Sequence, residues 1–476
     1  MKNNNIGIVW VRDDFRINKN EALSYASNNH NLVSAVYIYK KSDYEKKREA
    51  QRWWIYKSLK HYENDLKEFN IKLEFKTSDS FLSFFEKHST NKSLSFYWNK
   101  VYEPKYLSFD NKISKIFEKK KTNFKIFKGN ILNEYNEVKK NDGTPFKIFT
   151  PYWKTAEPIY IDKGFSKKLT VRKKEKNIKI LNKSDEIEKI LPNKKWYKKF
   201  ENYWEPSEKK AIKSCKEFVE EKINNYGDNR DVPGVEGTSK ISPYLANGQL
   251  NVESIWEICD RLPKKSIGYR KYINELGWRE FSHSLINYFP EMLKGNLRKE
   301  FNNFPWVKNK YYLEAWKKGK TGYPIVDAGM RELYETGWMH NRVRMITGSF
   351  LVKHLRIHWM EGEKYFRNCL LDFNEAANVS GWQWVSGCGA DAAPYFRIFN
   401  PILQGEKFDT EGLYVKKWVP ELKNIPKEFV HKPWEMEESI QEKFKTFIGK
   451  DYPKPIVEHT KAREAALNAF QKIKKN

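Results

Sequence analysis

The sequence contains few cysteines and no long apolar run. Its four cysteines are far apart and form no CxxC pair, so a disulfide scaffold is excluded and reduced thiols are expected. No stretch of ~18 apolar residues occurs, which argues against a membrane span. The N-terminus also lacks the apolar core of a secretory signal. We therefore expect a cytoplasmic protein that does not associate with membranes.

Two common cofactor patterns are missing as well. No GxGxxG follows the first apolar run, so ordinary dinucleotide binding at that position is unsupported. The nine histidines show neither HExxH nor another paired spacing typical of zinc. The sequence therefore predicts no metal site.

Positive charge is abundant. The 476 residues include 88 Lys and Arg against 61 Asp and Glu, a formal net charge of +27. A surplus of this size attracts polyanions, and nucleic acid is the leading candidate. Charge alone leaves a second interpretation open, in which the lysines form a solvated coat without such a partner.

Hydrophobic patterning divides the chain into three segments. Residues 1–130 alternate β-rich runs with helical patterns, which predicts an α/β domain with a parallel sheet. Residues 131–205 are rich in Lys, Glu and Asn and predict a long interdomain linker. Residues 206–476 carry long amphipathic patterns, for example over 269–288 and 328–358, and predict an all-helical domain. The expected strands cover residues 6–11, 32–39, 71–75 and 94–98.

Polar and aromatic residues recur at helical spacing in the last segment. The helical pattern over 338–345 places Asn341, Arg344 and Met345 on one face, which is simplest to interpret as a partly exposed face. Glu275 and Trp278 are one turn apart. Such a pair can hydrogen-bond and stack a nucleobase, or equally form part of an ion pair over a core indole.

Two further segments have the composition of a binding site. Residues 237–245 place hydroxyls and a lysine before Pro243. Such a segment can bind a phosphate group, or it can simply cap the following helix. Residues 372–384 combine acids, amides and small residues with two tryptophans, which suits a concave site for a flat ring but also occurs in ordinary cores. These residues predict a pocket and a phosphate site without defining a reaction.

Several longer strings resemble the photolyase/cryptochrome family. They are WVRDDFR at 10–16, TPYWK at 150–154, TGYPIVDAGM at 321–330, and the segments 338–345 and 381–409. The resemblance extends over nearly the whole chain and is strongest to the class I cyclobutane pyrimidine dimer (deoxyribodipyrimidine) photolyases. It implies a monomer that holds FAD in its helical domain and repairs such dimers in UV-damaged DNA. The expected reaction is light-driven electron transfer from excited, reduced FAD, and a cryptochrome-type photoreceptor without repair activity is the alternative.

The resemblance also implies roles for individual residues. Glu275 would hydrogen-bond the dimer, Asn378 would face the flavin N5, and Arg344 would pair with Asp372 beside the ring. At position 374 this chain has Asn, whereas many relatives have Asp. The implied electron chain consists of Trp306, Trp359 and Trp382. The implied flavin residues are Tyr226, Thr238, Ser239, Lys240, Ile241, Ser242, Tyr272, Arg279, Trp338, Asn341, Arg344, Asp372, Phe373, Asn374 and Asn378. The implied DNA-binding residues are Arg230, Glu275, Trp278, Asn341, Arg342, Met345, Trp384 and Gln404.

A second, light-harvesting chromophore is implied for the N-terminal domain. Asn99, Tyr102 and Glu103 resemble the antenna-side motif of the family, and Lys294 matches a position that can approach it. The residue beside that lysine is Leu293, where some folate-binding relatives carry a thiol. Folate, deazaflavin and the absence of an antenna all stay open.

Overall fold

The protein is described by a computed structural model that covers residues 6–44, 48–78, 80–166, 168–181 and 183–474. The chain forms two compact units. The first unit consists of residues 1–221, 239–288 and 371–376, and the second of residues 222–238, 289–370 and 377–476. Across the described ranges, no helix combines the length and the apolar character needed to cross a bilayer.

A five-stranded parallel sheet forms the centre of the first unit, with strand order β3-β2-β1-β4-β5. The strands are β1 (Ile6–Val11), β2 (Leu32–Lys40), β3 (Lys72–Ser78), β4 (Leu94–Asn99) and β5 (Asn123–Phe127). The four strands expected from the sequence are confirmed. Strand β5 was not expected, because exposed Asn123 and Lys125 alternate with Phe124 and Ile126 at the sheet edge and break any apolar run.

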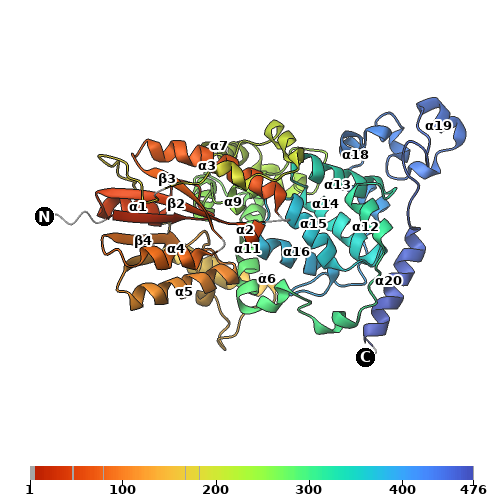
Figure 1. Cartoon of the computed structure of the whole chain (residues 1–476). Helices are drawn as coiled ribbons and strands as arrows, with labels where there is room; N and C mark the ends of the chain where they lie inside the picture. The colour runs from red at the N-terminus through yellow and green to blue at the C-terminus, as the bar shows by residue number, and fades with distance from the viewer. Residues whose placement is uncertain (1–5, 45–47, 79, 167, 182, 475–476) are drawn as a thin grey trace. The chain divides into compact units, whose positions relative to one another are not determined.

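Helices cover both faces of this sheet (Figure 1). On one face, Val9 and Tyr37 pack with α1 (Glu21–Asn29) and α3 (Glu49–Lys67). On the other face, Trp10, Val36 and Trp98 pack with α4 (Phe81–His88) and α5 (Pro104–Lys119). Successive strand residues point to opposite faces, so each face builds its own core. The α/β prediction for the N-terminal segment is therefore confirmed.

Helix α6 lies within the stretch predicted as a linker. It spans Phe149–Lys163 and buries aromatic side chains, including Tyr152 and Trp153. Pro151 and Pro158 interrupt its pattern, and because proline is a poor helix former the sequence did not suggest a helix there. The other helices of the first unit are α2 (Lys41–Tyr44), α7 (Glu208–Glu221), α9 (Ser242–Ala246), α10 (Val252–Asp260) and α11 (Ile267–Tyr288).

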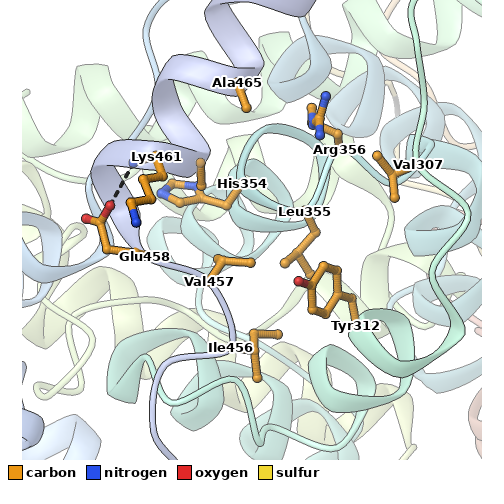
Figure 2. Close-up of a pocket in the computed structure, with 11 residues that line it drawn as sticks. Val307, Tyr312, His354, Leu355, Arg356, Ile456, Val457, Glu458, Lys461 and Ala465 are labelled. Atoms are coloured by element: carbon orange, nitrogen blue, oxygen red, sulfur yellow. Dashed lines mark hydrogen bonds between the residues drawn. The ribbon is translucent and has the colours of Figure 1, made fainter.

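The second unit is built from helices and connecting turns, as expected. Its helices are α8 (Tyr226–Asn229), α12 (Lys310–Lys317), α13 (Pro324–Thr336), α14 (Asn341–Ser349), α15 (Trp359–Cys369), most of α16 (Glu375–Ser386), α17 (Pro401–Phe408), α18 (Leu413–Trp418), α19 (Glu438–Phe444) and α20 (His459–Lys474). A π-helical turn covers Phe350–His354. An open cleft of about 270 Å³ lies beside the start of α20 (Figure 2). Short 3₁₀ turns in the two units span Tyr135–Glu137, Ile187–Ile190, Lys195–Asn202, Ile223–Asn225, Pro290–Leu293, Lys299–Asn303, Pro420–Leu422, Lys427–Phe429 and Pro433–Glu435.

The helical pattern expected over 328–358 is interrupted. Helix α13 ends at Thr336, where Gly337 caps it in the left-handed region with φ +71°. Helix α14 begins only at Asn341, and the His340 side chain caps it by accepting from the Arg342 N–H. The prediction that 338–340 are helical was therefore wrong, because periodicity alone does not register a glycine cap.

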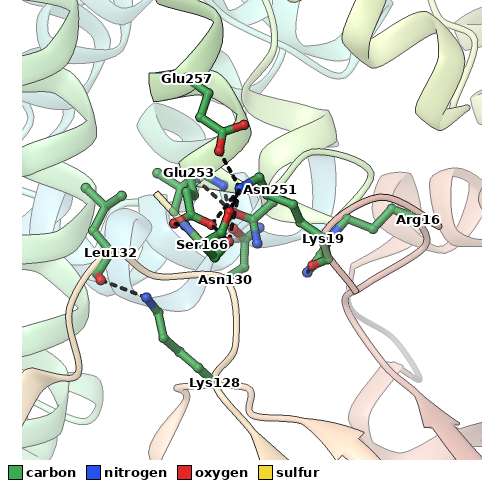
Figure 3. A network of polar contacts seen from close by, with 10 residues as sticks. Arg16, Lys19, Lys128, Asn130, Leu132, Ser166, Asn251, Glu253 and Glu257 are labelled. Atoms are coloured by element: carbon green, nitrogen blue, oxygen red, sulfur yellow. Dashed lines mark hydrogen bonds and ion pairs between the residues drawn. The ribbon is translucent and has the colours of Figure 1, made fainter. Parts of the chain in front are cut away.

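A polar network joins the segment after β1 to helix α10 within the first unit (Figure 3). The Lys19 ammonium donates to Glu253 Oε2 at 3.0 Å and to Glu257 Oε1 at 2.6 Å. Ser166 donates its backbone N–H to Glu253 Oε1 at 2.8 Å and its hydroxyl to Oε2. Burial raises the pKa of Glu253, but the hydrogen bonds from Ser166 and Lys19 outweigh burial and lower that pKa overall. The network therefore stabilises the fold while Glu253 is ionised.

Replacing Lys19 tests this network. Lys19→Met should lower the free energy of unfolding by about 1–3 kcal/mol at neutral pH, because a buried and a half-buried carboxylate lose their shared cation. The folded-state pKa of Glu253 lies below its ordinary 4.5, so its contribution is present above about pH 4.5 and is lost as pH falls through the folded value. Urea unfolding at pH 7 and pH 4 measures both effects. The exposed Lys154→Met is the control, and an equal loss in the two variants would contradict the prediction.

Candidate functional site

Helix α11 carries the two predicted lesion-binding residues of the first unit. Glu275 and Trp278 are both partly buried, so they reach the surface of the unit. The Trp278 indole is stacked on Phe149 of α6, with ring centroids 3.8 Å apart and an interplanar angle of 11°. Since Phe149 occupies one face of the indole, the opposite face is the one on which a flat ligand could stack.

Two predicted flavin residues of α11 have contacts that the sequence did not reveal. Arg279 donates from Nη1 to Glu280 Oε1 at 3.0 Å and from Nη2 to the Asn130 carbonyl at 2.7 Å. Burial lowers the pKa of Arg279, although the Glu280 carboxylate opposes the shift. Tyr272 is buried, and its ring packs against Phe218 at 4.7 Å. Arg279 therefore holds a turn of the first unit, and its expected contact with the flavin phosphates stays a prediction.

The hydroxyl-rich segment 239–242 meets the segment 371–376 in the first unit. Ser242 Oγ donates to Asp372 Oδ2 at 2.7 Å, although the two residues are 130 positions apart. Lys240 lies in the left-handed backbone region with φ +51°. The sequence predicted both segments as flavin-binding, and the structure brings them together. Ser239, Ile241, Phe373 and Asn374 belong to the same two segments.

Arg48 and Gln51 at the start of helix α3 and Asn247 at the end of helix α9 hold segment 371–376. The Arg48 guanidinium lies 4.6 Å from the Phe373 ring centroid, and Gln51 donates to the Phe373 carbonyl at 3.1 Å. Asn247 donates to the Leu371 carbonyl at 2.9 Å. No sequence signal identified these three side chains, because Gln51 precedes its partner by 322 positions.

In the second unit, two predicted DNA-binding arginines surround Asp231. Arg342 forms an ion pair with Asp231 at 2.7 Å, and Arg230 approaches the same carboxylate at 4.0 Å. The Arg230 guanidinium also lies 5.3 Å from the Tyr226 ring centroid. Thr238 belongs to this unit too. Asp231 was not singled out in the sequence, yet its negative charge orients both arginines.

Helix α14 presents the expected polar face. Asn341 is exposed and Arg344 and Met345 are half-buried, whereas Val343 and Ile346 point into the core. The predicted shared face is confirmed. Arg344 Nε donates to the Met339 carbonyl at 2.8 Å, and its guanidinium lies 6.0 Å from the centroid of the buried Trp338 ring.

Asn378 on α16 is oriented by a carboxylate of α15. Its Nδ2 donates to Glu363 Oε1 at 3.0 Å, and Arg367 donates to the same oxygen at 2.7 Å through Nη2. Glu363 is 5% exposed, so this ion pair is largely desolvated. Because a carboxylate paired with arginine only accepts hydrogen bonds, the amide nitrogen of Asn378 must face it. The carbonyl oxygen of Asn378 then points away, and it accepts no hydrogen bond from a described residue.

The three tryptophans of the predicted electron chain all lie in the second unit. Trp382 on α16 and Trp359 at the start of α15 are buried, with exposures of 4% and 1%, whereas Trp306 is half-buried. A Cβ at Gly362 would lie 2.1 Å from the Trp382 ring, so only glycine lets this indole pack on α15. Trp306 packs edge-on against His358 at 4.8 Å. Trp384 and Gln404, predicted to bind DNA, are half-buried in the same unit.

The predicted antenna residues of the first unit are held by internal hydrogen bonds. Asn99 Nδ2 donates to Asp14 Oδ2 at 2.7 Å and to Asn20 Oδ1 at 2.9 Å, and its Oδ1 accepts from the Ala22 N–H. Tyr102 donates its hydroxyl to Glu134 at 2.8 Å. These bonds fix the loops after β1 and β4, and binding of a chromophore there stays a prediction.

Two family models match separate segments of the chain. Residues 7–172 match the family model described as DNA photolyase, and residues 272–472 match the one described as FAD binding domain of DNA photolyase. A deoxyribodipyrimidine photo-lyase of Agrobacterium fabrum is 38% identical, with 98% of each chain covered. Cryptochrome-2 of Arabidopsis thaliana is 32% identical, covering all of this chain and 80% of the relative.

The fold agrees with that of a solved photolyase. The crystal structure of a bacterial class III photolyase from Agrobacterium tumefaciens has a TM-score of 0.92 and 37% sequence identity, covering 99% of this chain and 98% of the other. The sequence resemblance was strongest to class I photolyases, whereas this solved structure is a class III photolyase. The two comparisons agree on the family and differ on the class. With these matches over nearly its full length, the chain belongs to the DNA photolyase family, in which it also has cryptochrome relatives.

Proposed function

We propose that this protein is a deoxyribodipyrimidine photo-lyase that uses blue light and reduced FAD to split cyclobutane pyrimidine dimers in DNA. It would act as a monomer in the cytoplasm. The four cysteines are free and buried, which suits a reducing compartment. The net charge of +27 favours association with the phosphate backbone of DNA.

The half-exposed face of α11 is the observation that carries this proposal. Glu275 and Trp278 lie one helical turn apart, and the Phe149 ring stacks on one face of the Trp278 indole. A flipped pyrimidine dimer would stack on the other indole face and donate an N–H hydrogen bond to the Glu275 carboxylate. The carboxylate and the indole would thus orient the dimer for bond cleavage.

The residues around Asn378 fit a reduced flavin. Glu363 and Arg367 fix the amide so that its carbonyl oxygen faces outward as an acceptor. Reduced flavin carries an N–H at N5, and this is the hydrogen-bond donor that such an oxygen would accept. When bound, reduced FAD supplies the photoexcited electron and takes it back after cleavage. In the second unit, Asn378 and Arg344 would bind and orient the flavin.

The burial of the tryptophans supports a path for electrons from the protein surface. Trp306 is half-buried, whereas Trp359 and Trp382 are nearly inaccessible to solvent. The Trp359 indole is fixed by its hydrogen bond to Asn296 Oδ1 at 2.8 Å. We therefore assign Trp306 as the outer end of the chain, where the protein would be reduced from solution.

A repair assay tests the proposal directly. Illuminated protein carrying reduced FAD should remove thymine dimers from duplex DNA, and a dark sample should not. Glu275→Gln should slow repair about threefold to tenfold, because the dimer loses a charged hydrogen-bond partner. Glu220→Gln, an exposed carboxylate of α7, should leave the rate unchanged. Intact dimers after illumination, together with normal photoreduction of FAD, would favour the cryptochrome-type photoreceptor instead.

The orientation of Asn378 generates a second prediction. Glu363→Gln should speed the dark oxidation of bound, reduced FAD about threefold to tenfold, because a glutamine at 363 no longer forces the amide nitrogen of Asn378 inward. Absorbance at the flavin bands after transfer to air measures this rate. Glu361→Gln, which changes an exposed carboxylate of the same helix, is the control. Equal oxidation rates in all three proteins would remove Glu363 from this role.

The electron chain is tested by shortening it at its outer end. Trp306→Phe should reduce the rate of photoreduction of oxidised FAD to a small fraction of the wild-type rate. Repair by protein whose FAD has been reduced chemically should be unaffected, since that reaction does not use the chain. Trp418→Phe replaces another half-buried indole of the second unit and should change neither rate. Unaltered photoreduction in Trp306→Phe would disprove the assignment.

A further inference from the structure

The cleft beside α20 contains none of the residues predicted for flavin or DNA. Its walls come from the segments around Val307, Leu355 and Val457 and from the first two turns of α20 (Figure 2). Its volume is about 270 Å³, just below the range of pockets that hold drug-sized molecules. The lining residues are Val307, Tyr312, His354, Leu355, Arg356, Ile456, Val457, Glu458, Lys461, Ala462 and Ala465.

Apolar side chains make up just over half of the cleft lining. Six of its eleven lining residues have aliphatic side chains, and Tyr312 adds an aromatic ring. His354 is 4% exposed, and burial lowers its pKa to about 3, so it lines the cleft as a neutral ring. His354 Nε2 is hydrogen-bonded to His459 Nδ1 at 2.9 Å, which fixes that ring. A surface of this kind favours a ligand with a hydrocarbon or aromatic body.

The rim of the cleft carries uncompensated positive charge. Within the described residues, neither the Arg356 guanidinium nor the Lys461 ammonium has a hydrogen bond or an ion pair. The one carboxylate of the lining belongs to Glu458, and the backbone N–H groups of Thr460 and Lys461 bind it at 2.7 and 2.8 Å. Glu458 therefore caps α20, and its negative charge offsets only one of the two positive charges of the lining.

The backbone around Arg356 fixes its position. Arg356 has a left-handed backbone with φ +50°, an uncommon conformation for a residue with a side chain. Its carbonyl accepts the Val307 N–H at 2.8 Å, which locks this turn against the wall of the cleft. Lys353, three residues before Arg356, is 1% exposed, and its ammonium donates a hydrogen bond to the Arg397 carbonyl at 2.8 Å. Burial and the Arg397 charge lower the pKa of Lys353 to about 7, so this lysine is only partly charged at neutral pH.

We propose that this cleft is a binding site for a small aromatic carboxylate. The carboxylate would form paired hydrogen bonds with the Arg356 guanidinium at the rim, assisted by Lys461. The ring would lie on Leu355 and Val457, beside the ring of Tyr312. The six aliphatic side chains of the lining disfavour a fully hydrated inorganic anion, and the volume suits one ring with its acid group. This site is separate from the proposed repair chemistry and does not depend on it.

Binding can be measured on the full-length, FAD-loaded protein in the dark. The probe is 4-(trifluoromethyl)benzoate, followed by ¹⁹F NMR, and its neutral counterpart is 4-(trifluoromethyl)benzamide. The benzoate should bind with a dissociation constant on the order of 0.1–1 mM, as expected for a ligand of this size. The benzamide should bind at least about tenfold more weakly, because it cannot pair with Arg356. Equal binding of the two probes would overturn the proposal.

Substitutions then locate the site. Arg356→Gln should weaken benzoate binding about tenfold and Lys461→Gln about threefold, while Lys472→Gln, an exposed lysine further along α20, should have no effect. Ala465→Leu keeps both charges but fills the cleft, and should abolish binding. No change in Arg356→Gln, or full binding in Ala465→Leu, would overturn the proposal.

Two measurements on the unmodified protein cover the case of a variant that fails to fold. Unlabelled benzoate should displace the probe, and inorganic phosphate at the same concentration should not. Nuclear Overhauser contacts should connect the probe to the methyl groups of Val457 and Ala465. Displacement by phosphate as efficient as by benzoate, or contacts only to other parts of the chain, would show that the cleft is not a site for aromatic carboxylates.

Discussion

The predicted lesion-binding face depends on how closely α6 packs against α11. A Cβ at Gly277 would lie 2.6 Å from the Trp153 ring, so the two helices reach this distance only because α11 has a glycine there. One residue further along α11, Trp278 stacks on Phe149 at 3.8 Å. Dense packing of this kind restrains the indole to one orientation, because any rotation would clash with a ring already in contact. An indole that is already oriented in this way can stack on a base without first losing conformational freedom.

A buried carboxylate has the corresponding role in the second unit. Glu363 accepts hydrogen bonds from both Asn378 and Arg367, and its burial makes an unpaired arrangement costly. The pair therefore determines which atom of the Asn378 amide faces outward. Asp231 acts in a similar way on Arg230 and Arg342, whose positive charges would otherwise repel each other. In each case, a residue that is not itself expected to touch a ligand decides what its neighbours can bind.

Both units combine expected features with features that needed the structure. The strands β1 to β4 were predictable because buried parallel strands are continuous apolar runs. The polar face of α14 was predictable because helical periodicity places Asn341, Arg344 and Met345 together. Strand β5 and helix α6 were not, since an edge strand alternates with polar residues and prolines interrupt the α6 pattern. The break between α13 and α14 was also missed, because a glycine cap leaves the apolar periodicity intact.

The sequence by itself determined the class of fold, the helical character of the C-terminal half and the family to which the chain belongs, because these depend on local periodicity and on long ordered motifs. Tertiary structure alone decided the partners of each site residue: Ser242 with Asp372, Arg279 with Glu280 and Asn130, and Asn378 with Glu363. It also decided that Arg356 and Lys461 line one cleft together with a single carboxylate of the lining, that of Glu458. Hydrogen bonds and charge compensation act over a few ångströms in space, and the residues they join can lie more than a hundred positions apart in the chain.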